Sequence, residues 1–290
     1  MKKKYKKVFS LSLQSGYRNY TVRDLLETKG KKKLTQINVT TPEEAAAAEE
    51  AGIDLIIAGP PSPMKKIREA APKTFFTCGL NWTEHESKES VVRKCLELIE
   101  LGLDSLHCGS WNMEFVKYLS QFRIPIQGHV GLVPMKSTWT GGVKPFGKTS
   151  KEAEQIYKDI KELDGTSAWA VEVECVPKEI LAELTKTTKL LTISIGSGSE
   201  GDVQFLFAED ILGHSLIDTP RHAKIYRNFN KIFAQSKDDK KRIQELTNLQ
   251  IDYIGNLKLA KNKNNSSICL LYTSDAADEG LGVDLGGRRI

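Results

Sequence analysis

The stretch AWAVEVECVPKEILAELTKTTKLLTISI, residues 168–195, decides the fold. Its two apolar runs, 168–174 and 190–195, are separated by an amphipathic segment, which is the pattern of a βα unit in a parallel sheet. The same alternation extends from Thr21 to about Phe207 and gives eight candidate strands: residues 34–39, 55–58, 74–78, 105–108, 124–129, 168–174, 190–195 and 203–207. Eight such units close into a barrel, so we predict a single-domain α/β protein, a (β/α)8 TIM barrel.

Helix signals agree with this arrangement. Thr41 can cap a helix that begins with a proline and two glutamates, and Gly52 can end it. Segment 87–101 places its apolar residues on one helical face, and another helix is expected to open at Thr149 or the next residue. A late polar helix, 238–249, is expected to pack outside the barrel or against another subunit.

The chain divides into four parts. We expect a basic N-terminal extension over 1–20, the barrel with extra C-terminal helices over 21–255, and a polar tail over 256–268. Residues 269–290, CLLYTSDAADEGLGVDLGGRRI, resemble the translation of a sequencing-library adapter, so we expect them not to be natural protein.

Composition excludes several classes of protein. With 290 residues, 40% of them hydrophobic and 27% charged, the chain can build one large core and is not disordered throughout. No apolar run approaches the ~18–20 residues of a membrane-spanning helix. The basic start, 1–7, is followed by a segment too short and too rich in serine for a signal peptide. We therefore expect a cytoplasmic protein with no membrane partner.

Cysteine usage and charge narrow the choice further. The five cysteines are scattered, odd in number and free of any CxxC pair, which favours neither a disulfide framework nor a zinc ribbon. The net charge of +5 comes partly from the N-terminus and residues 31–33, with no basic face interleaved with aromatic residues. We expect no nucleic-acid partner.

Chemistry in such a barrel lies where each strand meets the loop that follows it. The predicted strand ends carry Gly59-Pro60, Gly79, His107 to Gly109, Gly128-His129, Glu174-Cys175 and Gly196 to Gly198.

These strand ends lie within segments that resemble a known family. IPIQGHVGLVP, residues 124–134, resembles the IPV.GH.GL.P signature of ketopantoate hydroxymethyltransferase, also called 3-methyl-2-oxobutanoate hydroxymethyltransferase. ECVP at 174–177 matches the family's ECVP, and IGSG at 195–198 is similar to its glycine-rich turn. Further similarity, in consistent order, covers roughly Thr21 to Gly213.

The resemblance implies a pantothenate-pathway enzyme that enolises 3-methyl-2-oxobutanoate. The enzyme would then add a hydroxymethyl unit from methylenetetrahydrofolate, giving 2-dehydropantoate. It implies Glu174 as the catalytic base, with His129 beside the 2-oxo acid and His107 in place of a substrate-binding lysine. The turn Gly196 to Gly198, around Ser197, can offer backbone N–H groups to a carboxylate or phosphate, and a tight barrel loop explains its glycines equally well. The family forms symmetric oligomers, so a homo-oligomer is also implied.

The family's magnesium site is missing from the sequence. Its three carboxylates correspond here to Pro60, Gly79 and Gly109, so the usual metal shell is absent and magnesium dependence is doubtful. The chain therefore resembles a divergent member.

Strand alternation suggests where another centre could arise. Residues two apart share a face, so Glu172 accompanies Glu174, and Gln127 accompanies His129. The same parity pairs Ser105 with His107, Thr77 with Gly79, and Thr192 with Ser194, and would give the barrel a polar interior.

Two interpretations of these polar positions stay open. His107, His129, Glu172 and Glu174 could form a relocated centre suited to zinc, manganese or iron. Alternatively, Glu172 and Gln127 hydrogen-bond between neighbouring strands in a purely structural cluster.

Three functions remain. The first is the hydroxymethyltransferase itself. The second is another oxo-acid lyase or aldolase on the same barrel, and the third is a non-catalytic paralogue that has lost the metal site.

Overall fold

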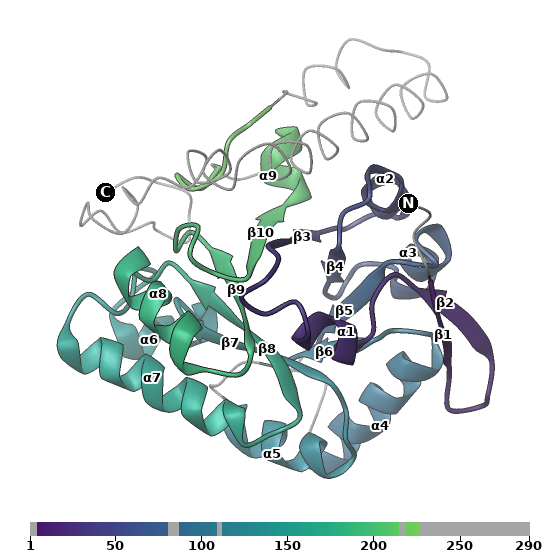
Figure 1. Cartoon of the computed structure of the whole chain (residues 1–290), viewed down its shortest axis with the longest axis horizontal. Coiled ribbons are helices and arrows are strands. Elements are labelled where there is room, and N and C mark those ends of the chain that lie inside the picture. The colour runs from purple at the N-terminus through teal and green to yellow at the C-terminus, as the bar shows by residue number, and fades with distance from the viewer. Residues whose placement is uncertain (1–4, 81–86, 109–111, 215–218, 227–290) are drawn as a thin grey trace.

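The computed structural model describes residues 5–80, 87–108, 112–214 and 219–226, and within them the chain forms a closed barrel of eight parallel strands (Figure 1). The strands follow one another around the barrel in chain order, and the last pairs with the first, with Val203 opposite Leu34. They are β3 (Leu34–Asn38), β4 (Leu55–Ala58), β5 (Phe75–Gly79), β6 (Ser105–His107), β7 (Ile126–Gly131), β8 (Ala168–Glu174), β9 (Leu191–Ile195) and β10 (Val203–Phe207).

All eight predicted strands are present, so the (β/α)8 prediction is confirmed. Three strands have the predicted bounds, and the others differ by one or two residues at one or both ends. The link between β9 and β10, residues 196–202, is a short loop without a helix.

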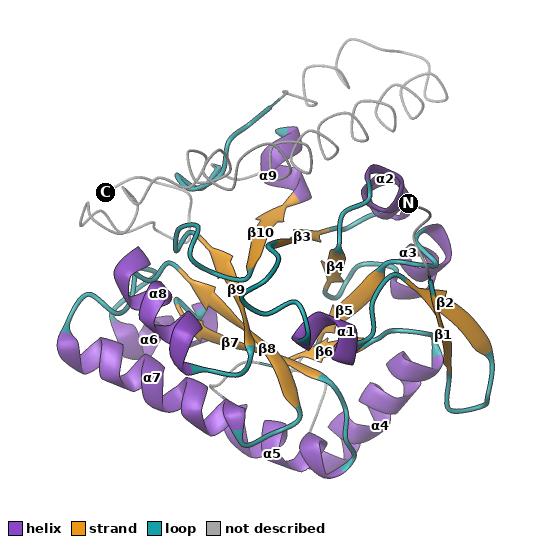
Figure 2. Ribbon diagram, viewed as in Figure 1, coloured by secondary structure: helices purple, strands orange, loops and turns teal. Residues whose placement is uncertain are grey.

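Most of the helices form the outer layer of the barrel (Figure 2), whereas the first helix contributes Leu25 to the interior. Thr41, Ser87 and Thr149 each cap a helix through a capping box, as the sequence predicts for Thr41 and Thr149, and Gly52 ends its helix in the left-handed conformation. The helices are α1 (Val22–Leu26), α2 (Pro42–Ala51), α3 (Met64–Ala70), α4 (Lys88–Glu100), α5 (Met113–Gln121), the 3-10 helix η3 (Pro134–Lys136), α6 (Ser137–Thr140), α7 (Ser150–Asp164), α8 (Lys178–Thr187) and α9 (Ala208–Leu212).

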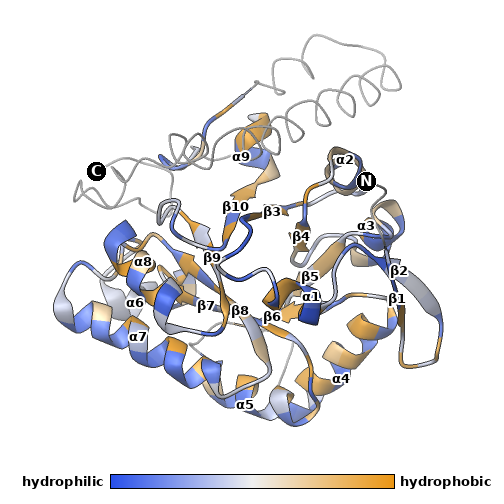
Figure 3. Cartoon of the chain, in the orientation of Figure 1, coloured by the Kyte–Doolittle hydropathy of each residue, from blue (hydrophilic) through white to orange (hydrophobic). Residues whose placement is uncertain are grey.

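Apolar side chains form two cores, one on each side of the barrel wall. The outer core fills the space between strands and helices, and includes Ile56, Leu106 and Val171. The inner core contains Leu55 and Trp169. Figure 3 shows the matching pattern, with apolar strands and with helices that carry apolar and polar stripes. Strands buried on both faces are typical of parallel barrels.

An antiparallel hairpin, β1 (Lys6–Phe9) and β2 (Ser15–Arg18), precedes the barrel, and the sequence analysis did not anticipate it. Its last residue, Arg18, is buried, and its Nε–H donates a hydrogen bond to Asp104 Oδ1 at 2.7 Å. Arg68 contacts the same carboxylate at 3.2 Å. Part of the predicted basic extension is thus anchored to the barrel.

Aspartates tie strands together at the amino-terminal end of the barrel. Asp54 accepts hydrogen bonds from the backbone and the hydroxyl of Thr35, both at 3.1 Å. Asp202 does the same for Thr192, at 3.0 and 3.1 Å. Asp104 accepts a hydrogen bond from the Phe76 N–H of β5 at 2.9 Å. Each aspartate directly precedes one strand and holds the start of a neighbouring strand.

Several expectations lie outside the described residues. They are the helix at 238–249, the rest of the C-terminal helices, the polar tail and the segment 269–290. Among the residues that the structure describes, no helix combines the length and apolar character needed to cross a membrane.

Candidate active site at the barrel mouth

Four polar side chains meet at the carboxyl ends of three adjacent strands. β6, β7 and β8 are neighbours, and their register sets His107 beside Gln127, and His129 beside Glu172. Glu174 ends β8, opposite Gly131. The predicted site residues of this region therefore lie together because the strands that carry them are hydrogen-bonded to one another.

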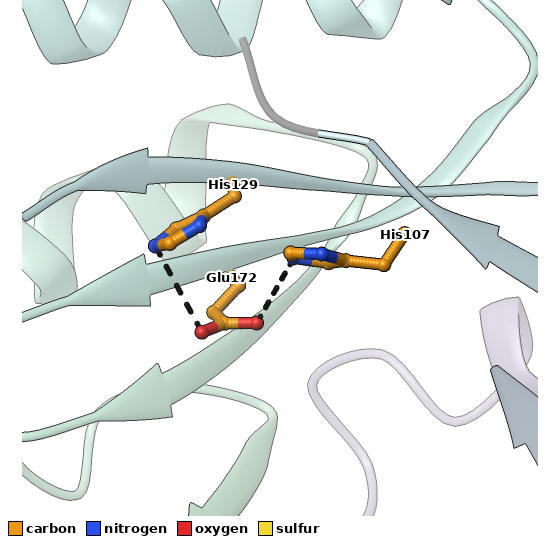
Figure 4. Close-up of side chains that lie close together, drawn as sticks. All are labelled: His107, His129 and Glu172. Atoms are coloured by element: carbon orange, nitrogen blue, oxygen red, sulfur yellow. Dashed lines mark ion pairs between the residues drawn. The ribbon is translucent and has the colours of Figure 1, made fainter. Parts of the chain in front are cut away.

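The two imidazoles flank the Glu172 carboxylate (Figure 4). His107 Nε2 lies 3.3 Å from Glu172 Oε2, and His129 Nε2 lies 3.8 Å from Glu172 Oε1. His129 Nε2 is also hydrogen-bonded to Glu174 Oε2 at 3.0 Å. A buried carboxylate is costly without partners, and these contacts supply them for Glu172.

Burial and charge set the protonation preferences of this group. Burial favours the neutral form of Glu172, but the charges of His129 and His107, together with hydrogen bonding, outweigh it and lower the pKa. Burial raises the pKa of Glu174, and His129 offsets this only in part. Burial opposes protonation of His129, yet the two carboxylates raise its pKa overall. The site therefore favours a charged Glu172–His129 pair, with Glu174 as the more basic carboxylate.

The predicted polar interior is correct for some strands and wrong for one. Gln127, Ser105 and Thr77 are buried, and Ser105 accepts a hydrogen bond from the indole of inner-core Trp169 at 2.8 Å. On β9, however, Leu191, Ile193 and Ile195 belong to the inner core.

Thr192 and Ser194 therefore face outward, against the prediction. The Thr192 hydroxyl hydrogen-bonds Thr185 of α8 at 2.8 Å, and Ser194 donates to the Gly198 carbonyl at 2.6 Å. Both polar groups are satisfied on the outer face of the barrel wall.

Ser197 is buried in the turn after β9. Its hydroxyl accepts a hydrogen bond from the Val176 N–H at 2.8 Å and donates to the Val173 carbonyl at 2.9 Å. The side chain therefore ties the turn to β8. A substrate contact through the backbone of this turn stays a prediction.

The family's magnesium shell does not fit the described residues. A Cβ built on Gly79 would lie 3.3 Å from the Cα of Gly59, so a side chain there would crowd the end of β4. Pro60 is exposed. Gly109 lies outside the described residues.

Cys108 and Cys175 act as small buried groups. Burial raises the pKa of both thiols far above the ordinary value, so neither thiolate forms readily.

His222 is a neighbour of the site that sequence reasoning missed. A Cβ on Gly196 would lie 3.0 Å from His222 Nδ1 and 3.0 Å from Cys175 Sγ, so the imidazole packs against the turn after β9. Burial lowers the pKa of His222 to about 4. The residue follows no predicted strand, so no sequence signal marked it.

Fold and site together define the class of protein: a TIM-barrel enzyme whose paired carboxylates and imidazoles lie at the carboxyl ends of its strands. Comparison with known proteins then supplies the family. Residues 61–242 match the family described as ketopantoate hydroxymethyltransferase, and the chain belongs to that family of transferases.

Curated relatives agree with this assignment. The 3-methyl-2-oxobutanoate hydroxymethyltransferase of Kosmotoga olearia is 31% identical over 72% of this chain and 87% of its own length. The enzyme of the same name from Staphylothermus marinus is 30% identical, over 79% of this chain and 92% of its own. That from Pyrococcus abyssi is 28% identical, over 79% and 89%.

Proposed function

We propose that this protein transfers a hydroxymethyl unit from methylenetetrahydrofolate to 3-methyl-2-oxobutanoate, giving 2-dehydropantoate. The observation that carries the proposal is the placement of Glu174. Its carboxylate ends β8 within hydrogen-bonding distance of His129, 3.0 Å, at the end of the barrel where such enzymes perform their chemistry. The names of the curated relatives support the same substrate.

In this proposal Glu174 takes the proton from C3 of the 2-oxo acid. The resulting enolate carbon forms a bond with the methylene carbon of the folate. Water supplies the hydroxyl oxygen, both bonds from the methylene carbon to the folate nitrogens break, and tetrahydrofolate leaves with those nitrogens protonated. His129 holds the Glu174 carboxylate in place through their hydrogen bond.

The loop after β7 supports a folate site. Trp139 is 91% exposed, and it lines a cavity of about 590 Å³ together with Met135 and Lys136. An exposed aromatic ring can stack on a pterin, and lysine can bind the glutamate tail. Because the loop begins where β7 ends, a folate held there lies on the same side of the barrel as His129.

Exchange of the C3 proton tests the base directly. Proton NMR of 3-methyl-2-oxobutanoate in deuterated buffer requires no folate and isolates enolisation. We expect the wild-type protein to catalyse exchange and Glu174→Gln to slow it about 10²- to 10⁴-fold, the contribution typical of a general base. Glu179→Gln, which changes an exposed glutamate of α8, serves as the matched control and should exchange at the wild-type rate.

Product formation separates the remaining functions. With methylenetetrahydrofolate present, we expect 2-dehydropantoate. Exchange without this product would contradict the proposed transfer and favour another oxo-acid enzyme on the same barrel. Absence of both, with magnesium, zinc, manganese or cobalt supplied, would favour a non-catalytic paralogue.

A further inference from the structure

Two imidazoles and one carboxylate converge in the barrel mouth with the spacing of a metal site. Donor atoms of His107, His129 and Glu172 all lie within 4.8 Å of one another. We propose that these three side chains hold a divalent transition-metal ion. Binding of the ion is argued from these donors alone, whereas the role given to it below rests on the proposed function.

The distances suit a small ion. Ligand atoms bound at about 2.0–2.2 Å in tetrahedral geometry lie roughly 3.3–3.5 Å from one another. Here Glu172 lies 3.3 Å from His107 Nε2 and 3.8 Å from His129 Nε2, each through a different carboxylate oxygen. Figure 4 shows both rings directed at the carboxylate from the neighbouring strands.

Unsatisfied polar atoms point to a missing ligand. Gln127 Oε1 is buried without a hydrogen-bond partner among the described residues, and buried His107 Nε2 lies 3.3 Å from Glu172 Oε2 but outside hydrogen-bonding geometry. Gln127 is fully buried, and its amide nitrogen donates to Glu172 Oε2 at 3.3 Å, so its free oxygen lies beside the cluster. Buried polar groups are nearly always satisfied. A metal ion would bind His107 Nε2, and a water molecule on that ion could donate a hydrogen bond to Gln127 Oε1.

Supporting contacts of the kind found around metal ligands are already present. Gln127 orients the Glu172 carboxylate, and the ring of His129 also hydrogen-bonds the backbone of Leu132. Metal-bound histidines and carboxylates are typically held by such outer contacts. The His107 side chain is 20% exposed, which gives an ion a path from solvent.

The donor set selects the kind of metal. Two imidazoles and one carboxylate suit zinc, iron, cobalt or manganese, whereas magnesium prefers oxygen ligands. Three protein ligands also leave a coordination position for substrate. A Lewis acid at this position would bind the 2-oxo acid and stabilise its enolate. His129 Nε2 would then bind the ion in place of its hydrogen bond to Glu174, which would leave that carboxylate free to act as the base. The chain would thereby keep metal-assisted enolisation after losing the family's carboxylates.

Metal content of the full-length protein tests the site without reference to activity. After incubation with zinc and dialysis, we expect about one zinc per chain by elemental analysis. His107→Gln and Glu172→Gln should each bind zinc at least about a hundredfold more weakly. His214→Gln, which alters a histidine paired with Glu44 elsewhere, is the matched control and should retain zinc. Wild-type protein without zinc, or equal zinc in all variants, would overturn the proposal.

Three further measurements test the ligand set without relying on variants that could misfold. Cobalt should give a visible absorption spectrum with nitrogen and oxygen ligands and no thiolate band, which excludes Cys108 and Cys175 as ligands. Gln127→Met preserves volume and should weaken zinc binding about 10- to 100-fold while the protein stays folded. Zinc should raise the melting temperature of the wild type, and magnesium should not. Unchanged zinc affinity in Gln127→Met, or a thiolate band, would contradict the proposed ligand set.

The metal site and the proposed function can fail separately. Stoichiometric zinc with no exchange of the C3 proton would leave the site standing and overturn the function. Exchange by metal-free protein would support the function and overturn the catalytic role given to the ion, while zinc content alone decides whether the three side chains bind it.

Discussion

At the scale of a single residue, Gly131 shows how closely the backbone of β7 approaches that of Glu174. It ends β7 with φ +87°, and a Cβ there would lie 2.3 Å from the Glu174 carbonyl oxygen and 2.7 Å from Val176 Cγ2. Only glycine tolerates both the positive φ and this contact. The close approach fixes the position of Glu174 relative to His129.

We therefore expect Gly131→Ala to lower both stability and activity. The left-handed conformation and the clash together should cost more than about 2 kcal/mol, measured by urea unfolding. Displacement of Glu174 should also slow C3 proton exchange. Gly30→Ala is the control, since Gly30 has φ +67° but nothing within 4 Å of its built Cβ. Equal losses in both variants would show that the contact with Glu174 has no effect.

Burial of His222 predicts how the stability of the protein depends on pH. Burial lowers its pKa to about 4 in the folded state, against about 6.5 in the unfolded chain. The neutral imidazole is therefore favoured by folding. The neutral imidazole contributes about 3 kcal/mol to the free energy of unfolding. This contribution is present above about pH 6.5 and is lost as the pH falls towards 4.

Urea unfolding between pH 7 and 4 measures this effect. We expect the wild type to lose about 3 kcal/mol more than His222→Gln over this interval. Parallel pH profiles for the two proteins would contradict the lowered pKa, since they would mean that folding leaves the pKa of His222 unchanged.

At the scale of elements, the hairpin β1–β2 is part of the folded unit. Arg18 extends from it to Asp104, which also contacts Arg68. A buried charge that loses a partner is strongly destabilising, so we expect Arg18→Ala to lower the free energy of unfolding by about 3 kcal/mol.

The exposed pair Arg23–Glu27 provides the control for Arg18. Arg23 is 89% exposed, and its replacement by alanine should change stability by less than about 1 kcal/mol. Chemical unfolding of both variants measures the difference. A similar small change for both would show that the hairpin is not needed for stability.

The elements differ in how well the sequence predicts them. The eight barrel strands were predictable because short apolar runs alternate with capped amphipathic helices. The hairpin was not, since its strands are four residues each and mostly exposed, so they carry no apolar pattern. The prediction that Thr192 and Ser194 face the barrel interior was wrong. Both faces of β9 are buried, so burial of these residues does not tell which face they lie on. Its polar residues are satisfied by α8 and the following turn.

The site was predictable for a related reason. His107, His129, Glu172 and Glu174 stand at the ends of consecutive strands, so barrel closure alone brings them together. His222 comes from a segment after the barrel, and only tertiary packing places it near the turn after β9.

At the scale of the whole molecule, the two ends of the barrel carry different groups of polar residues. Asp54, Asp104 and Asp202 hold the amino-terminal ends of strands, while the polar cluster occupies the carboxyl ends. In TIM barrels the first end serves stability and the second serves chemistry.

Asp202→Ala tests this division. Asp202 accepts hydrogen bonds from Thr192 and forms an ion pair with Lys29 at 2.9 Å. Its replacement should therefore lower the free energy of unfolding, measured in urea, by about 3 kcal/mol. Folded variant protein should keep the wild-type rate of C3 proton exchange. Glu200→Ala, at an exposed neighbour, is the control and should change neither quantity. Slower exchange in folded Asp202→Ala would contradict the separation of the two ends.

The aspartates at the base also bear on how such a barrel diversifies. Because strand pairing is secured far from the mouth, a duplicated gene can lose one set of metal ligands and gain another through intermediates that all still fold. The same separation guides laboratory evolution. A library randomised at the carboxyl ends of β4 to β8 would sample new chemistry while most of its members remain folded.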